Sequence, residues 1–176
     1  MSKNLSCLIY GINYYPELTG IGKYTGEMGA WLSERGHDVQ VVTAPPYYPE
    51  WRIGEGYSGR WFRSERLAGG RVLRCPLWVP PQPGGLKRLV HLLSFALSSI
   101  PALLWSLRRR PDVIIVVAPA IFCAPAAWLA ARLSGAKCWL HIQDFEVEAA
   151  FDLGLLKGAA NQKVGIGSRA LVIASF

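Results

Sequence analysis

The sequence has few charged residues and few cysteines, and each shortage excludes a class of protein. Charged residues make up 18% of the 176 residues, whereas 51% are hydrophobic. This composition excludes a disordered chain and is sufficient for the core of one α/β domain. The four cysteines are widely spaced and form no CxxC pair. We interpret them as reduced core residues of a cytoplasmic protein rather than as a disulfide framework or a metal site.

The first residues also lack the features of a secretory signal peptide. No basic segment, long apolar stretch and small-residue cleavage site precede the first strand pattern. We therefore expect the protein to work in the cytoplasm.

Acidic residues are scarce in one region of the chain. Between Trp51 and Arg110 there are eleven Lys and Arg but only two acids, whereas the rest has eight Lys and Arg and ten acids. The net charge of +7 therefore comes from this region, which is either a solvated basic face or a binding surface for phosphates, acidic lipids or nucleic acid. Because no nucleic-acid-binding motif accompanies it, we expect no nucleic acid partner.

The pattern of apolar residues predicts the fold. Helical patterns cover Gly22–Arg35, Leu86–Arg109 and Ala124–Leu133. Runs rich in apolar and β-branched residues predict six strands, at Leu5–Tyr10, Val39–Thr43, Arg71–Cys75, Val113–Val117, Lys137–Ile142 and Ala170–Ala174. Strands that alternate with helices predict a Rossmann-like, doubly wound α/β domain, with a mostly parallel sheet and helices on both faces. The first, fourth and fifth runs are almost continuously apolar, so we expect both faces of these strands to be buried.

Two loop features interrupt this pattern. The segment Ala44–Gly70 is rich in Pro, Gly and charge, and we expect a functional or mobile loop there. The tetrapeptide Tyr-Tyr-Pro-Glu occurs twice, at Tyr14–Glu17 and Tyr47–Glu50, each time after a predicted strand. Both copies should lie at the carboxyl edge of the sheet, and we interpret the repetition as a coincidence of loop chemistry.

A long apolar helix is predicted in the middle of the chain. The stretch from Leu89 to Leu107 contains no acid, Lys or Arg, and it is long enough to span a bilayer. Pro101 and several polar residues interrupt it, and the strands on either side should belong to one sheet, which argues against a span. The alternatives are a buried crossover helix and a helix that also lies in a membrane interface. In the second case the membrane-facing cations are Lys87, Arg88, Arg108, Arg109 and Arg110.

A glycine-rich turn follows the first predicted strand. The glycines Gly20, Gly22 and Gly26 match neither the G-x-G-x-x-G nucleotide fingerprint nor the P-loop, since Lys23 is not followed by Ser or Thr. Glycine nevertheless lets backbone amides approach a ligand closely, and a helix start adds free N–H groups and a positive dipole. A diphosphate or an anionic sugar fits such a site, although tight strand–helix packing is the alternative reason for these glycines.

A group of acids follows the fifth predicted strand. Asp144, Glu146 and Glu148 alternate there, at the same carboxyl edge as Gly20. These carboxylates could bind sugar hydroxyl groups, act as a general base, interact with the positive end of a helix that starts there, or bind a metal ion. We expect no metal, because no second histidine follows His141.

Long stretches of the chain resemble the family 4 glycosyltransferases of GT-B fold, and more narrowly those of colanic acid biosynthesis, the WcaI type. They include YGINYYPELTGIGKYTGEM, WLSERGHDVQVVTAPPYYPEW, PDVIIVVAPAIFCAPAAWLAARLSGAK and LHIQDFEVEAAFDLGLLKG. Together the similar stretches cover about residues 5–158.

The resemblance implies a metal-independent enzyme without a cofactor that transfers a sugar, with retention, from a nucleotide diphosphate sugar to a lipid-linked or growing exopolysaccharide acceptor. It implies that Gly20, Ile21 and Gly22 approach the donor diphosphate. Asp144 would be the catalytic residue near the reacting sugar, and Lys23, Tyr24 and Glu148 would contact the acceptor. We expect the enzyme to be peripheral to the inner membrane.

The resemblance also implies a domain division. Residues 1–157 correspond to the N-terminal, acceptor-side domain, and residues 158–176 form an atypical tail with a final strand. The family's second domain, which carries the basic pair and the E-x7-E signature of the donor site, is absent from this sequence. We therefore expect the chain alone to be inactive, and a non-catalytic binding or regulatory module remains the alternative.

Overall fold

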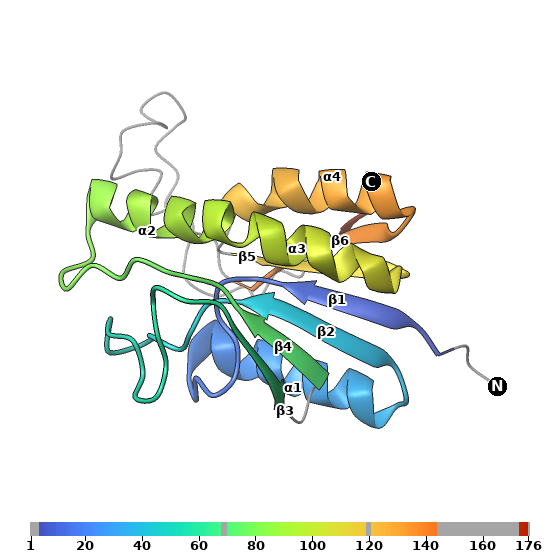
Figure 1. Ribbon diagram of the computed structural model, residues 1–176, viewed down its shortest axis with the longest axis horizontal. Coiled ribbons are helices and arrows are strands. Elements are labelled where there is room, and N and C mark those ends of the chain that lie inside the picture. The colour runs from blue at the N-terminus through green and yellow to red at the C-terminus, as the bar shows by residue number, and fades with distance from the viewer. Residues whose placement is uncertain (1–3, 68–69, 119–120, 144–172, 176) are drawn as a thin grey trace, which may run out of the picture.

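The computed structural model describes residues 4–67, 70–118, 121–143 and 173–175, and these form one layered α/β domain (Figure 1). The seven strands are β1 (Ser6–Tyr10), β2 (Asp38–Thr43), β3 (Arg63–Leu67), β4 (Gly70–Arg74), β5 (Val113–Ala118), β6 (Lys137–Ile142) and β7 (Ile173–Ser175). The helices are α1 (Gly20–Glu34), α2 (Gly85–Ser98), α3 (Ile100–Ser106) and α4 (Ala124–Ser134), with 3-10 turns η1 (Leu107–Arg109) and η2 (Ile121–Cys123).

The strands form one sheet in the order β3-β4-β2-β1-β5-β6-β7. Strands β4, β2, β1, β5 and β6 are parallel, and β3 and β7 pair antiparallel at the two edges. The predicted doubly wound, mostly parallel fold is therefore confirmed, and the predicted final strand is described over residues 173–175.

Helices cover both faces of the sheet, as expected. Helices α2, α3 and α4 lie on one face and α1 on the other (Figure 1). The larger core cluster, around Tyr10, Phe95 and Leu103, lies on the first face, and the smaller cluster, around Ile9 and Val41, packs under α1. Cys7, Cys75 and Cys123 are buried, as expected of core residues, and Cys138 is partly buried.

The predicted loop Ala44–Gly70 contains a strand that the sequence pattern did not indicate. Strand β3 reads RSERL, and most of its residues are exposed. It pairs with β4 as an edge strand, and its Glu65 is bound by the buried Arg74, with Arg74 Nε 2.7 Å from Glu65 Oε1. An edge strand that is stabilised by an ion pair does not need alternating apolar and polar residues. The search for such residues therefore did not predict β3.

The long predicted helix is broken in two. Helix α2 ends at Ser98, and α3 begins at Ile100 with Pro101 in its first turn. Proline has no N–H to continue the hydrogen-bond ladder, and its ring clashes with the preceding turn. The break is therefore a consequence of Pro101.

The prediction that the fifth strand is buried on both faces is wrong. Strand β6 has no fully buried residue, and its Lys137 and Trp139 are exposed. Cys138 and Leu140 pack against the α2–α4 side. The opposite face of β6 has no helix over it among the described residues, so its apolar composition did not mean burial on both sides.

Candidate functional site

The loops that follow β1 and β2 meet at the carboxyl edge of the sheet. These loops carry the two Tyr-Tyr-Pro-Glu copies, and each contains a cis peptide bond before its proline. Glu17 Oε1, from the first copy, accepts hydrogen bonds from the backbone N–H groups of Tyr47 and Tyr48 in the second, both at 3.1 Å. The repetition is thus more than a coincidence of loop chemistry, because the copies contact each other directly.

Glu17 is a buried carboxyl group at the centre of this contact. Besides the two backbone donors, Asn13 Nδ2 donates to Glu17 Oε2 at 2.9 Å. Burial raises the pKa of the Glu17 carboxyl above its ordinary value, and the three donors oppose this shift because they stabilise the charged form. Glu50, at the equivalent position of the second copy, is exposed, so only the first copy supplies a buried acid.

Arg74 ties the same two loops to the sheet edge. Its side chain is 1% exposed, and its guanidinium donates to the carbonyl oxygens of Ala44, at 3.0 Å, and of Tyr15. Its third contact is the Glu65 carboxylate described above. Each of the three guanidinium nitrogens thus donates a hydrogen bond, and through the carbonyl groups of Tyr15 and Ala44 Arg74 links the loops after β1 and β2.

The glycine-rich turn lies beside these loops and begins α1. Gly20 is exposed and has φ +56°, a left-handed conformation that favours glycine. A Cβ on Gly20 would lie 3.6 Å from the Tyr48 ring and meet nothing else nearby. The N-cap residue Thr19 makes no side-chain cap bond, and the first turn contains no acid. The start of α1 therefore presents backbone N–H groups and a positive dipole at the edge.

Gly22 has a different environment from Gly20. It is buried, and a Cβ there would overlap Glu17 Oε2. A Cβ on Gly26 would approach Tyr15 Cβ at 2.8 Å. These two glycines are required for the close packing of α1 on the first Tyr-Tyr-Pro-Glu loop. Of the three, Gly20 has the geometry for amide approach to a ligand, and the donor-binding role of Gly20, Ile21 and Gly22 stays a prediction.

The end of β6 reaches the same edge. Gln143 Nε2 donates to Thr25 Oγ1 on α1 at 3.3 Å, although the two residues are 118 positions apart. The predicted catalytic Asp144 directly follows Gln143, and Asp144 and Glu148 lie outside the described residues. Lys23 and Tyr24 are exposed on α1, so they are accessible from solvent, and their acceptor-binding role also stays a prediction.

Sequence reasoning did not identify His91 as part of this region. His91 lies on α2, is buried, and contacts the rings of Tyr47 and Trp51 at centroid distances of 4.7 and 5.2 Å. Its Nδ1 lies 2.7 Å from the Trp78 carbonyl oxygen. Burial lowers the pKa of His91, so the ring is neutral and Nδ1 donates. His91 thus supports the loop after β2, and the polar residue within an apolar helix was the available signal.

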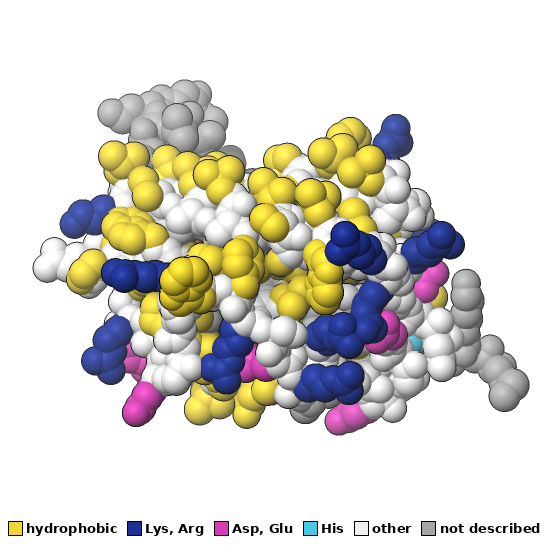
Figure 2. All heavy atoms as spheres, in the orientation of Figure 1, with side chains coloured by type: hydrophobic (Ala, Val, Ile, Leu, Met, Phe, Trp, Pro, Cys, Tyr) yellow, Lys and Arg dark blue, Asp and Glu magenta, His cyan; other side chains and the backbone are white. Residues whose placement is uncertain are grey.

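The exposed surface of α2 and α3 is apolar and ends in cations. Figure 2 shows hydrophobic side chains over the helices, with Lys and Arg side chains beyond them. The apolar stripe consists of Leu86, Val90, Leu93, Leu97, Ile100 and Leu104, all at least 36% exposed. Lys87, Arg108, Arg109 and Arg110 are exposed and Arg88 is partly buried. The stretch Gly85–Arg109 is long and apolar enough to cross a membrane by length and composition, but 44% of its apolar window is buried.

No group of three His, Cys, Asp or Glu side chains suited to a metal ion occurs among the residues that the structure describes. The expectation of a metal-independent, cofactor-free reaction stays a prediction.

Comparison with known proteins identifies the family. Residues 19–171 match the family described as glycosyl transferase 4-like domain. The chain is 56% identical over 160 residues to a curated Escherichia coli (strain K12) protein that is named as a colanic acid biosynthesis glycosyl transferase, WcaI. This match covers 91% of the chain but 39% of the relative. The chain therefore spans less than half of that protein's length.

A solved structure shares the fold. The calicheamicin glycosyltransferase CalG4 superimposes with a TM-score of 0.51 at 17% identity, over 82% of this chain and 34% of that one. At this identity the match shows the fold alone. The described sheet and helices therefore have the α/β fold of about a third of that glycosyltransferase chain.

Proposed function

Since the chain belongs to the glycosyl transferase 4-like domain family, we propose that it is the acceptor-side domain of a glycosyltransferase of exopolysaccharide biosynthesis. The observation that carries this proposal is the 56% identity over nearly the whole chain. In the full-length enzyme a sugar passes, with retention, from a nucleotide diphosphate sugar to a lipid-linked or growing polysaccharide.

The geometry of the carboxyl edge supports a role for the α1 start in donor binding. The exposed N–H groups at Gly20 and the absence of acids from the first turn suit the negative charge of a diphosphate. The Glu17 and Arg74 networks hold the loop that leads into this turn against the loop after β2. Asp144 directly follows Gln143 in the sequence, and we propose that its carboxylate acts near the reacting sugar. No metal ion or cofactor is needed in this scheme.

The apolar stripe of α2 and α3 supports attachment to a membrane surface. An exposed row of aliphatic side chains beside cations is the pattern of a helix that lies in a membrane interface. This face would bring the domain to the cytoplasmic side of the inner membrane, where a lipid-linked acceptor is found. A spanning helix is disfavoured because β4 and β5, on either side of the stretch, belong to one sheet.

A thermal unfolding experiment tests the proposed function on the chain as it is. Nucleotide diphosphate sugars and lipid-linked oligosaccharides are each added to the folded protein, and a raised unfolding temperature with either ligand supports the acceptor-side domain. If neither ligand changes the unfolding temperature, the alternative of a non-catalytic module is favoured.

The membrane attachment has its own test. The protein should sediment with anionic vesicles at low salt, and replacement of Arg108, Arg109 and Arg110 by Ala should weaken this by about 1 kcal/mol per residue. Unchanged sedimentation of the triple variant would contradict the electrostatic part of the proposal.

A further inference from the structure

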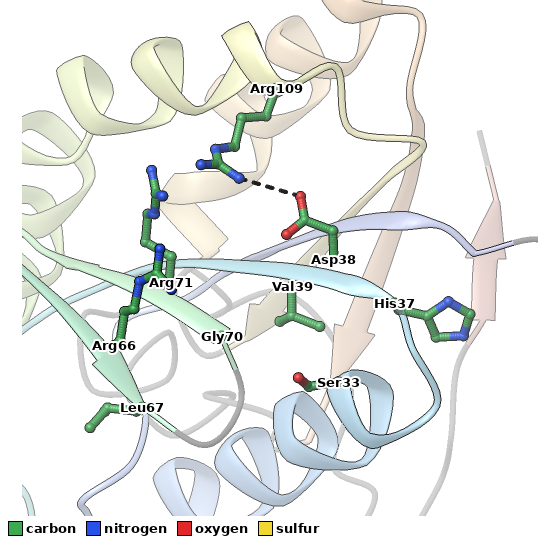
Figure 3. A pocket seen from close by; sticks show the side chains of 9 residues that line it. All are labelled: Ser33, His37, Asp38, Val39, Arg66, Leu67, Gly70, Arg71 and Arg109. Atoms are coloured by element: carbon green, nitrogen blue, oxygen red, sulfur yellow. Dashed lines mark ion pairs between the residues drawn. The ribbon is translucent and has the colours of Figure 1, made fainter.

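A basic cavity lies at the amino edge of the sheet, at the opposite end of the strands from Gly20. It occupies about 270 Å³ beside the start of β2 and the β3–β4 hairpin, and its lining includes Ser33, Asp38, Arg66, Arg71 and Arg109. Figure 3 shows that Arg66 and Arg71 come from the hairpin and that Arg109 reaches over from η1 toward Asp38. Of these residues, the function proposed above uses only Arg109, as one of the membrane-facing cations.

Two of these arginines form a like-charge pair without a counterion. Arg66 and Arg71 are directly opposite each other in the antiparallel β3–β4 register, so both side chains start from the same face of the hairpin. Like charges in this arrangement destabilise a sheet. Within the described part of the chain, neither side chain has an ion pair or a hydrogen bond.

The second arginine pair of the same hairpin provides a comparison. Arg63 and Arg74 are also opposite each other, but Glu65 lies between them, with Oε2 3.7 Å from Arg63 Nε and Oε1 2.7 Å from Arg74 Nε. The hairpin therefore neutralises one arginine pair with a carboxylate and leaves the other at the cavity. The charges of Arg66 and Arg71 are thus available to a ligand at the cavity.

The third arginine, Arg109, forms only a weak ion pair. Arg109 Nη1 lies 3.6 Å from Asp38 Oδ2, and the two side chains are 39% and 58% exposed. An ion pair this long and this exposed contributes little free energy. His37, also at the cavity, accepts a hydrogen bond on Nδ1 from the Leu5 N–H. Three guanidinium groups thus oppose one carboxylate.

We propose that this cavity binds a phosphate group through Arg66, Arg71 and Arg109. The planar guanidinium fork matches phosphate oxygens in a bidentate manner. The volume lies below the roughly 300–1,000 Å³ of sites for drug-sized ligands, which favours a single phosphate head over a whole nucleotide. Two sources supply this chemistry: the phosphodiester of an acidic phospholipid, and a soluble phosphate compound. The proposal does not depend on sugar transfer.

The first experiment uses inorganic phosphate and the whole 176-residue chain. Phosphate is titrated at constant ionic strength while the Nε–H signals of the arginines are followed by NMR. The signals of Arg66, Arg71 and Arg109 should shift together. The double substitution Arg66→Gln/Arg71→Gln should weaken binding by at least tenfold, because the loss of one hydrogen bond to a charged group typically costs about that factor or more.

A matched control removes the same charge elsewhere. Arg52 and Arg60 are exposed and lie outside the cavity, so Arg52→Gln/Arg60→Gln should change phosphate binding by less than twofold. Asp38→Asn should strengthen binding several-fold, because the competing carboxylate is removed from Arg109. If the double substitution lowers the unfolding temperature, Arg109→Gln replaces it and should show the same loss.

The second experiment distinguishes the two sources. Vesicles of phosphatidylcholine, with and without phosphatidylglycerol, are sedimented with each variant. If the Arg66/Arg71 variant loses more binding to phosphatidylglycerol vesicles than the control pair does, the ligand is a lipid headgroup. If only the binding of free phosphate is lost, the ligand is soluble. If the cavity variant and the control pair bind both phosphate and vesicles equally well, the proposal is wrong.

Discussion

At the scale of single residues, Gly22 determines how closely α1 packs on the loop after β1. Glycine in a helix interior usually costs about 0.5–1 kcal/mol relative to alanine, so Gly22→Ala would be stabilising on an open helix surface. Here the added Cβ overlaps the Glu17 carboxylate, and we expect a loss of about 1–3 kcal/mol in the free energy of unfolding. Urea unfolding of the variant measures this. The exposed Glu27→Ala on the same helix should stay within about 0.5 kcal/mol, and a Gly22→Ala variant as stable as the wild type would contradict the packing role.

Glu17 should make the stability depend on pH. Its folded pKa is raised, so its contribution to stability is fully present below the unfolded pKa of about 4.3 and is lost as the pH rises through the raised folded value. Glu17→Gln does not titrate, and its amide oxygen can still accept from Tyr47 and Tyr48. The stability of this variant relative to the wild type should therefore be higher at pH 7 than at pH 4, because only the wild type loses stability as the pH rises.

Unfolding in urea at the two pH values tests this expectation. Glu27→Gln is the matched control, because Glu27 is exposed on α1 and its carboxylate remains in water in both states. A Glu17→Gln difference that is the same at both pH values would show that burial does not control the titration of Glu17.

The residue-scale features show where sequence reasoning stops. The repeated tetrapeptide and the glycine-rich turn were visible as patterns, and their common edge followed from the parallel strand order. The hydrogen bonds from Tyr47 and Tyr48 to Glu17 join loops 30 residues apart, and no local pattern encodes such a contact. The same is true of Arg74, whose burial depends on carbonyl groups from two other loops.

At the scale of elements, apolar composition predicted where strands lie but not how they are buried. Strands β1 and β5 are apolar and mainly buried, as expected. Strand β3 is polar and was missed, because its edge position is maintained by Glu65 and Arg74 rather than by a core face. In the α2–α3 stretch, Pro101 indicates the helix break from the sequence alone. The division of the apolar residues into a buried and an exposed face became visible only in the structure.

The exposed stripe on α2 and α3 leads to a prediction about membrane binding. Leu97 and Leu104 are 67% and 49% exposed, so Leu97→Ser/Leu104→Ser should hardly affect folding. Burial of one leucine side chain contributes about 1.5–3 kcal/mol, and even half of this for each residue means at least a tenfold loss of vesicle binding. Sedimentation with anionic vesicles measures the loss.

The control for the stripe removes similar apolar surface elsewhere. Trp61 and Phe62 are 75% and 55% exposed, and they lie in the segment before β3 and not on α2 or α3. The variant Trp61→Ser/Phe62→Ser should retain its vesicle binding. Equal losses for the two double variants would show that general surface hydrophobicity, and not the stripe, causes the binding.

At the scale of the whole molecule, the carboxyl edge forms one side of the proposed reaction site. The chain spans 39% of its Escherichia coli relative, and the family resemblance assigns the E-x7-E donor signature to a second domain. We therefore expect the isolated chain to fold and to release no nucleoside diphosphate from nucleotide diphosphate hexoses. A chimera in which this chain replaces the matching 160 residues of the relative should release it when an acceptor-containing membrane fraction is added, because 56% identity preserves most contacts between the two halves.

The chimera also tests the turn at the start of α1. Gly20→Val places a branched side chain at φ +56°, where it would displace the backbone and cover the N–H groups proposed to approach the donor. We expect at least a hundredfold loss of transfer, since removing one such donor costs about 10²–10³ in rate in a characterised enzyme. Glu34→Val, exposed at the far end of α1, should transfer normally. An unchanged unfolding temperature would separate lost transfer from lost folding, and wild-type turnover in the folded Gly20→Val chimera would refute the donor role of this turn.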